Sequence, residues 1–333
     1  MKNKLDVLKK MNNSKVMCLG HISADIIIHR SNLERLKIGG TIQSNDLRIS
    51  GGGSAANVAF WMGVLNQRVE FIGVIGNDLS GLFLKSELDR VNVKSHFKYS
   101  KKYPSASILI IVEPNGERSF IINGKSQDDL EWEDLPLSDI KSSKIFYTSA
   151  YTLENPPICN TMIELLEFIQ ISKKEKPEVI LNLAAYTTVK KQLSRLRSKV
   201  LGNIDILIGN IAEYQELLNT KLKLNELEPI ILSQLHEIFP NIKIIILTNG
   251  EKGSNFYKLS ESGHIPAPKI CVVDTTGAGD GFTAGFISSY VLGKNLPEAV
   301  HDGVTLGSYI CQGYGARYKS NEYFSYLRDI KGK

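Results

Sequence analysis

The sequence has few cysteines, no long apolar run and no apolar segment near its start, and each absence excludes a class of protein. Scattered cysteines without a Cys-x-x-Cys pair indicate buried free thiols rather than disulfides or a metal site. They are Cys18, Cys159, Cys271 and Cys311. No apolar stretch approaches the roughly 20 residues that a membrane-spanning helix needs. Residues 1–14 are polar and lysine-rich, so we expect a cytoplasmic protein with a short solvated extension.

An excess of charge of one sign is also missing, because 40 lysines and arginines are matched by 35 aspartates and glutamates. The net charge is +5, and the small lysine clusters at 173–176 and 190–199 are typical of solvated helix faces. A nucleic-acid surface would need a concentrated basic stripe with stacking aromatics. We therefore expect neither a nucleic acid nor a membrane as partner. A mildly basic enzyme that handles phosphates is sufficient to explain the charge.

With 333 residues, 42% of them hydrophobic, the chain can form a large core. Beyond residue 130 the pattern alternates between strands and helices, which predicts a mostly parallel sheet covered on both faces. The predicted strands here span 145–148, 179–183, 204–210 and 242–248, and the helices 160–172, 187–200, 211–218 and 226–239. Elsewhere we predict strands at 16–20, 69–76 and 254–258, and helices at 54–65, 80–90 and 296–311.

Four further segments read as strands outside this sheet, at 25–30, 41–50, 105–113 and 117–122. The last two flank Pro114-Asn-Gly116, which predicts a hairpin turn.

The stretch 271–286 reads Cys-Val-Val-Asp-Thr-Thr-Gly-Ala-Gly-Asp-Gly-Phe-Thr-Ala-Gly-Phe. It predicts a strand end at 271–273, a glycine-rich turn, and a helix that continues to Val291. The first N–H groups of a helix lack intrahelical partners and lie at the positive end of its dipole, so the turn predicts an anion site. Gly277 and Gly279 allow successive N–H groups to converge on one oxyanion. Asp280 is placed to take a proton from a hydroxyl that attacks the anion. A plain helix N-cap is the alternative.

Three more stretches place polar groups beside predicted helix starts or strand ends. Three glycines, 51–53, precede a helix in which Asn57 offers both a donor and an acceptor. Asp25 follows the strand at 16–20, where ligands of open α/β sheets bind, although a turn aspartate explains it equally well. Asn210 and Glu213 share one helical face, and a cap with a surface glutamate is the alternative.

Together these stretches resemble the signatures of the PfkB (ribokinase-like) carbohydrate kinases. The C-terminal signature corresponds to 274–282, and the N-terminal one to the Gly-Gly-x-x-x-Asn element at 52–57 with the Gly-x-x-Gly-x-Asp loop at 73–78. Asn-x-x-Glu at 210–213 and Thr-x-Gly-x-x-Gly at 248–253 resemble two further elements. Family members often carry Glu directly after that Asn, where this chain has Ile211. The motifs follow the family's order from Gly20 to Ala316.

The resemblance implies a single kinase domain with a ribokinase-like α/β fold. Its large part would comprise 15–24, 51–104 and 123–333, and a small β lid about 25–50 and 105–122. It implies transfer of phosphate from ATP with Mg²⁺. The implied catalytic residues are Asp280, Gly277, Ala278 and Gly279, and the N–H groups of Ala278, Gly279 and Asp280 would hold the γ-phosphate. The other implied roles are acceptor binding for Asp25, Gly53 and Asn57, and nucleotide contact for Asn210, Thr248, Gly250, Gly253 and Gly315. Glu213 would bind Mg²⁺ through water, and Asp274 a monovalent cation such as K⁺.

The glycine run lacks the lysine that ribokinases place before the asparagine, and 181–186 and 205–210 resemble adenosine kinases. We therefore favour a nucleoside, phosphorylated on a hydroxymethyl group, over a free sugar such as fructose. A non-catalytic sensor of a sugar or nucleoside is the other class, and Asp280 argues against it. The glycine patterns of P-loop kinases and Rossmann dehydrogenases are missing. Exposed lid edges favour a homodimer joined through the lid.

Overall fold

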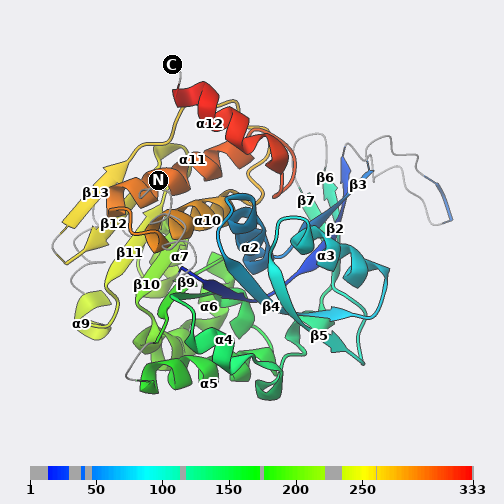
Figure 1. Ribbon diagram of the computed structural model, residues 1–333, viewed down its shortest axis with the longest axis horizontal. Coiled ribbons are helices and arrows are strands. Elements are labelled where there is room, and N and C mark those ends of the chain that lie inside the picture. Colours follow the sequence, from blue (N-terminus) through cyan, green and yellow to red (C-terminus); the bar gives the residue numbers. More distant parts are fainter. Residues whose placement is uncertain are drawn as a thin grey trace, which may run out of the picture.

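The computed structural model describes residues 14–29, 39–41, 47–112, 118–172, 176–221, 235–259 and 261–331. Its main sheet has nine strands in the order β13-β12-β11-β10-β9-β8-β1-β4-β5 (Figure 1). The strands are β1 Val16–Leu19, β4 Val69–Gly76, β5 Lys94–Ser100, β8 Ile145–Ser149, β9 Glu178–Asn182, β10 Ile206–Asn210, β11 Ile244–Thr248, β12 Ser254–Lys258 and β13 Glu261–Ile265. All neighbours pair in parallel up to β11, and β12 and β13 are antiparallel.

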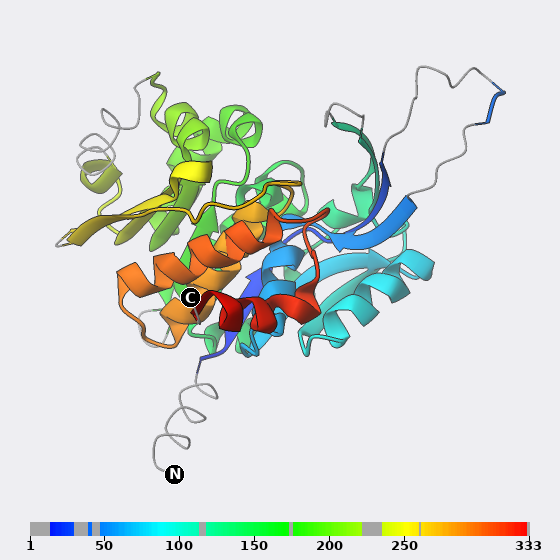
Figure 2. The same cartoon turned by 90° about the horizontal axis from the view of Figure 1, so that it is seen from above.

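Helices cover both faces of this sheet, as predicted from the alternating pattern (Figures 1 and 2). Successive side chains of a strand point to opposite faces. In β1, Val16 and Cys18 accordingly join one hydrophobic core and Met17 and Leu19 the other. The first core contains residues of α2 Ser54–Val64, α3 Leu79–Asp89, α10 Ala278–Val291, α11 Leu296–Ile310 and α12 Tyr323–Lys331. The second contains residues of α4 Leu137–Lys141, α5 Ile158–Ile171, α6 Tyr186–Arg195 and α7 Ile211–Leu218.

A small second sheet lies beside the carboxyl side of the main one, and its described strands overlap the four segments predicted outside the main sheet (Figure 2). Its order is β3-β2-β6-β7. The strands are β2 Ser23–His29, β3 Leu47–Gly52, β6 Ser107–Val112 and β7 Arg118–Asn123. β2 pairs with β6 in parallel, and the other two pairings are antiparallel. We call this sheet the lid. The ribokinase-like fold is therefore confirmed, with lid strands that reach slightly beyond the predicted 25–50 and 105–122.

Some local predictions differ from the structure. The segment 271–273 is not a strand: Val273 donates its N–H to the carbonyl of Cys311 at the end of α11, 2.8 Å away, and pairs with no strand of the main sheet. Val272 is 58% exposed and Cys271 is exposed, whereas the other three cysteines are buried. The pattern did not predict β5, β13 or α12. Most of the predicted helix 226–239 lies outside the described residues, and a short helix α9 spans His236–Ile238.

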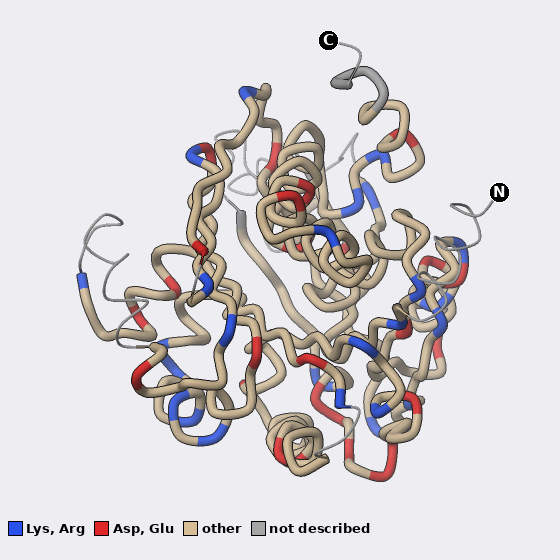
Figure 3. Tube along the Cα trace, turned by 60° about the vertical axis from the view of Figure 1, so that its left-hand side comes forward, with Lys and Arg blue, Asp and Glu red and all other residues tan. Residues whose placement is uncertain are grey.

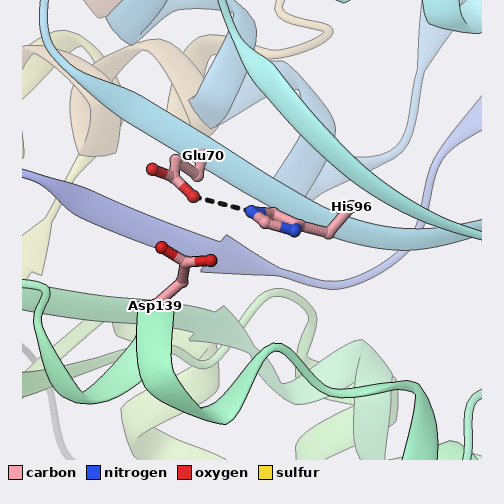
Figure 4. Close-up of side chains that lie close together, drawn as sticks. All are labelled: Glu70, His96 and Asp139. Carbon is pink, nitrogen blue, oxygen red and sulfur yellow. Dashed lines mark hydrogen bonds and ion pairs between the residues drawn. The ribbon is translucent and has the colours of Figure 1, made fainter.

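An ion-pair cluster lies at the amino ends of β1 and β4. Nε2 of His96 is 2.6 Å from Oε2 of Glu70, and Asp139 of α4 lies beside both (Figure 4). These residue types suit a metal ion, but Lys15 and Lys94 each contact both carboxylates. A divalent cation would have to displace two ammonium groups. We therefore assign the cluster to anchoring the start of β1, which follows Lys15 directly.

Charged residues of both signs are interspersed along the trace (Figure 3). None of the described helices combines the length and the apolar character needed to cross a membrane.

Candidate active site

A cavity of about 800 Å³ opens at the carboxyl ends of the parallel strands. Side chains that end or follow five neighbouring strands line it: His21 after β1, Tyr151 after β8, Asn182 on β9, Asn210 on β10 and Thr248 on β11. The chain runs outward from β1 in one direction through β4 and β5 and in the other through β8 to β11. The cavity therefore lies at the point where the strand order reverses, which is the usual ligand position in open α/β sheets.

The head of α10 forms one wall of the cavity through Gly277, Gly279 and Asp280. Gly277 precedes the helix with φ +79°, and a Cβ there would lie 2.5 Å from Cβ of Ala316. A Cβ on Gly279 would meet no heavy atom within 4 Å, so that side of the turn is open to the cavity. Ala278 already donates its N–H to the carbonyl of Thr275, 3.1 Å away. The N–H groups of Gly279 and Asp280 are thus the donors that this turn presents to an anion.

The carboxylate of Asp280 is held by two donors from α2. Ser54 Oγ donates to Oδ1 at 2.7 Å, and Asn57 Nδ2 donates to Oδ2 at 2.9 Å. Burial raises the pKa of Asp280 to about 6, against the two hydrogen bonds, which lower it. The carboxylate is therefore ionised at neutral pH and retains lone pairs for a further hydroxyl. A partly desolvated carboxylate with free acceptor capacity suits a general base.

Gly52 and Gly53, just before α2, allow two close approaches. A Cβ on Gly52 would lie 2.1 Å from Oδ2 of Asp25, and one on Gly53 would lie 2.4 Å from the carbonyl oxygen of His21. Asp25 accepts a hydrogen bond from Ser23 Oγ at 2.8 Å. Burial raises the pKa of Asp25 to about 6, and the nearby charge of Asp280 adds to the rise. Asp280 is therefore close enough for its charge to affect the protonation of Asp25.

Asn210 and Glu213 form a reciprocal capping box at the start of α7. Oε2 of Glu213 accepts from the Asn210 N–H at 2.9 Å, and its Oε1 accepts from Asn210 Nδ2 at 2.7 Å. Glu213 is only 4% exposed yet lines the cavity, and burial raises its pKa to about 7. Such a carboxylate is stabilised by a nearby cation, so its surroundings fit Mg²⁺ at this wall.

Thr248 lines the cavity, whereas Gly250 and Gly253 of the turn that follows it do not. Gly253 adopts φ +93°, and a Cβ there would lie 2.0 Å from the carbonyl oxygen of Ile265 on β13. Gly250 is exposed, with φ +52°. The backbone conformation of this turn is therefore sufficient to explain why both positions are glycine, without a bound nucleotide.

Asp274 ties the loop before α10 to the loop after α11. Its Oδ1 accepts from the N–H and the hydroxyl of Thr276, at 2.9 and 2.7 Å, and its Oδ2 accepts from the N–H of Gly315 at 2.9 Å. The structure thus brings Asp274 and Gly315 together, through an N–H donor rather than a carbonyl.

The structure gathers half of the predicted site residues directly around the cavity. Those that line it are Gly53, Asn210, Glu213, Thr248, Gly277, Gly279 and Asp280. Asn57 lies behind this wall, in contact with Asp280. The remaining predicted residues are not among the described residues that line the cavity: Asp25, Ala278, Gly250, Gly253, Asp274 and Gly315.

Sequence reasoning missed Ser54, Asn182 and Arg317. Ser54 lies inside the recognised glycine motif, and Asn182 could have been found because it lies near the carboxyl end of the strand predicted at 179–183. Arg317 reaches Asn57 from the far end of the chain, with Nε 3.2 Å from Oδ1 of Asn57. No spacing in the sequence signals that contact, because 260 positions separate the two residues.

Known proteins are similar to this chain in sequence and in fold. The sequence profile described as the pfkB family carbohydrate kinase matches residues 13–322. A ribokinase of Dictyostelium discoideum is 29% identical over 297 residues, which cover 85% of this chain and 89% of that protein. A protein named probable fructokinase-6, chloroplastic, of Arabidopsis thaliana is 27% identical over 282 residues, covering 82% and 69% of the two chains.

Among solved structures, the adenosine kinase of Sinorhizobium meliloti superposes with a TM-score of 0.79 at 25% identity. The alignment covers 95% of this chain and 99% of that one. Because the profile extends over nearly the whole chain and the site carries the expected motif residues, the protein belongs to the pfkB family of carbohydrate kinases.

Proposed function

We propose that this kinase transfers the γ-phosphate of ATP to the hydroxymethyl group of a nucleoside or sugar. The observation that carries the proposal is Asp280, held by Ser54 and Asn57 at the rim of an open anion turn. A base and an anion site on the same helix start allow one step to use both.

In that step Asp280 takes the proton of the acceptor hydroxyl as its oxygen forms a bond to the γ-phosphorus. The bond between that phosphorus and the bridging β-oxygen breaks, and ADP leaves. The N–H groups of Gly279 and Asp280 stabilise the charge on the transferring group. The protein acts by positioning and electrostatics, and no covalent intermediate is needed.

The charge of the cavity supports a metal requirement. Its described lining contains the acidic side chains Glu154, Glu213 and Asp280 and no lysine or arginine. The anionic phosphates of ATP would be repelled by such a lining. Glu213 with Asn210 would hold Mg²⁺ through water, and the ion would neutralise the phosphate oxygens when bound.

The lid supports a nucleoside acceptor. Ile108, Phe120 and Ile122 point from the lid into the cavity, and the alternation of β7 places Phe120 and Ile122 on the same face. An aromatic ring and two branched chains can cover a flat base. A free sugar is the second candidate, favoured by relatives that are named ribokinase and fructokinase.

Activity on a panel of acceptors tests the proposal. ATP consumption with Mg²⁺ would be measured on adenosine, inosine, ribose, fructose and 2-keto-3-deoxygluconate, with Asp280→Asn as control. We expect turnover on a nucleoside that the variant lacks. Turnover on a free sugar alone would show that the acceptor is a sugar rather than a nucleoside and would leave the proposed phosphate transfer unchanged. Tight binding of one compound without turnover would refute catalysis and favour a sensor.

Two finer proposals concern a cation and assembly. If a monovalent cation binds near Asp274, activity should be higher in K⁺ than in Na⁺ at equal ionic strength. Equal rates in the two salts would contradict a cation site at Asp274.

The outer lid residue Ile121 is 63% exposed, which supports pairing of two lids. Light scattering of the wild type and Ile121→Lys would test this, since a monomeric wild type excludes the dimer.

A further inference from the structure

One arginine from the C-terminal part of the chain lies directly behind the proposed base. The side chain of Arg317 is 3% exposed. Its Nε donates to Oδ1 of Asn57 at 3.2 Å, and its Nη1 donates to Oε2 of Glu87 on α3 at 3.2 Å. Since Asn57 in turn donates to Asp280, a hydrogen-bonded chain runs from Glu87 through Arg317 and Asn57 to Asp280.

The donors and acceptors in this chain can be arranged in only one way. A guanidinium can only donate, so the atom of Asn57 that faces Arg317 must be the amide oxygen. The amide nitrogen then faces Asp280, whose ionised carboxylate can only accept. Arg317 therefore fixes which end of the Asn57 amide the base contacts.

The surroundings of Arg317 are shaped to hold it. A Cβ on Gly51 would lie 2.0 Å from Nη1, so only glycine leaves room for the guanidinium. The guanidinium lies over the ring of Phe60, 4.5 Å from its centroid. The preceding residue, Ala316, is fixed by Trp61, whose Nε1 donates to its carbonyl oxygen at 2.8 Å. Ala316 also packs against Gly277, so one loop contacts both the anion turn and the acceptor side.

We propose that Arg317 is a positioning residue of the active site, which orients the Asn57 amide against Asp280 and keeps a positive charge behind the acceptor. The proposal rests on the proposed function for its catalytic consequence. Its structural content, the coupling of Arg317 to the Asp280 carboxylate, can be measured without turnover.

Charge supports this geometry. Arg317 lowers the pKa of both Asp25 and Asp280, against the burial that raises them. Burial lowers the pKa of Arg317 itself to about 10, so it stays charged at neutral pH. The other titratable groups facing Asp280 are Tyr147 and Tyr151 of the β8 end, whose pKa values are raised by burial, so both are neutral there.

The chain contains a matched control in Arg90. It also binds Glu87, with Nε 2.7 Å from Oε1, and its guanidinium also lies over Phe60, 4.8 Å from the ring centroid. Arg90 is more exposed, and no contact joins it to Asn57 among the described residues. Arg90→Gln therefore removes the same kinds of interaction with Glu87 and Phe60, while Arg317, Asn57 and Asp280 keep their contacts with one another.

The kinetic experiment compares Arg317→Gln, Arg317→Lys and Arg90→Gln with the wild type, on the acceptor that the panel identifies. For Arg317→Gln we expect kcat/KM of the acceptor to fall about ten- to hundredfold, the loss of one charge-assisted hydrogen bond. The acid limb of its pH profile should move up by about one unit. Arg317→Lys should leave the acid limb of the pH profile where it is in the wild type but still lower kcat/KM of the acceptor. Arg90→Gln should change neither kcat/KM nor the acid limb. Wild-type kinetics in Arg317→Gln would overturn the proposal.

A second measurement separates this idea from the proposed function. NMR titration of ¹³C-labelled aspartate carboxyls identifies Asp280 as the resonance lost in Asp280→Asn. Its titration midpoint should rise in Arg317→Gln and stay unchanged in Arg90→Gln, whether or not any acceptor is phosphorylated. An unchanged midpoint in Arg317→Gln would refute the coupling. If that variant does not fold, Arg317→Lys is compared by its acceptor KM and kcat, and wild-type values would overturn the amide role.

Discussion

Replacing Asp280 by asparagine should destroy activity and at the same time stabilise the fold. The substitution preserves shape, because the new amide oxygen can accept from Asn57 while its nitrogen donates to the hydroxyl oxygen of Ser54. Loss of the base should lower kcat by about 10²- to 10⁴-fold at pH 8. In the wild type, kcat/KM should rise with pH through about pH 6, where Asp280 ionises.

The expected gain in stability follows from the pKa of Asp280. Burial raises it from 3.8 to about 6, and each unit corresponds to about 1.4 kcal/mol. The native state keeps this proton at pH values where the unfolded chain has lost it, so the free energy of unfolding falls as pH rises through this range. For this one group the fall is about 3 kcal/mol, of which about 2 kcal/mol lies between pH 4.5 and 7. Asparagine does not titrate, so the variant avoids that loss.

Urea unfolding at several pH values measures the difference between the two proteins. The stability of Asp280→Asn relative to the wild type should increase by about 2 kcal/mol from pH 4.5 to 7. Asp89→Asn is the control, because Asp89 lies on an exposed part of α3 and pairs only with Lys85 among the described contacts. A difference that is constant with pH would refute the buried, ionised base, and activity within tenfold of the wild type would refute its catalytic role.

Three further substitutions test neighbouring walls of the cavity. Gly277→Ala should lower the free energy of unfolding by at least about 1–2 kcal/mol, because it combines φ +79° with a clash at Ala316; unchanged urea unfolding would contradict this. Gly279→Ala should leave stability unchanged and raise the KM for ATP, since its Cβ would enter open space in the cavity; a normal KM would show that phosphate does not bind there. Glu213→Gln keeps the backbone bonds of the capping box and loses the bond that Glu213 accepts from Asn210 Nδ2. It should require several-fold more free Mg²⁺ for half-maximal rate, and an unaltered Mg²⁺ titration would contradict a metal role for Glu213.

The local sequence was sufficient to predict an element where its hydrophobic periodicity repeats or where a single motif marks it. Alternating strands and helices beyond residue 130 predicted the parallel sheet, because each buried strand and amphipathic helix carries its own periodicity. The glycine turn before α10 likewise identified Asp280. The strand prediction for 271–273 failed because apolar residues alone do not show whether a neighbouring strand is present. Val273 pairs instead with the carbonyl of Cys311.

The sequence by itself thus determined the fold class, the family and the helix that bears the proposed base, since all of these depend on residues close together in the chain. Only the tertiary structure decided how that base is held. Ser54 and Asn57 meet Asp280 across 226 and 223 positions, and Arg317 meets Asn57 across 260. Such contacts follow from the packing of α2 against α10 and of the loop after α11 behind both. Hydrogen bonds between distant segments leave no periodic signal in a sequence, and the protonation of Asp280 depends on them.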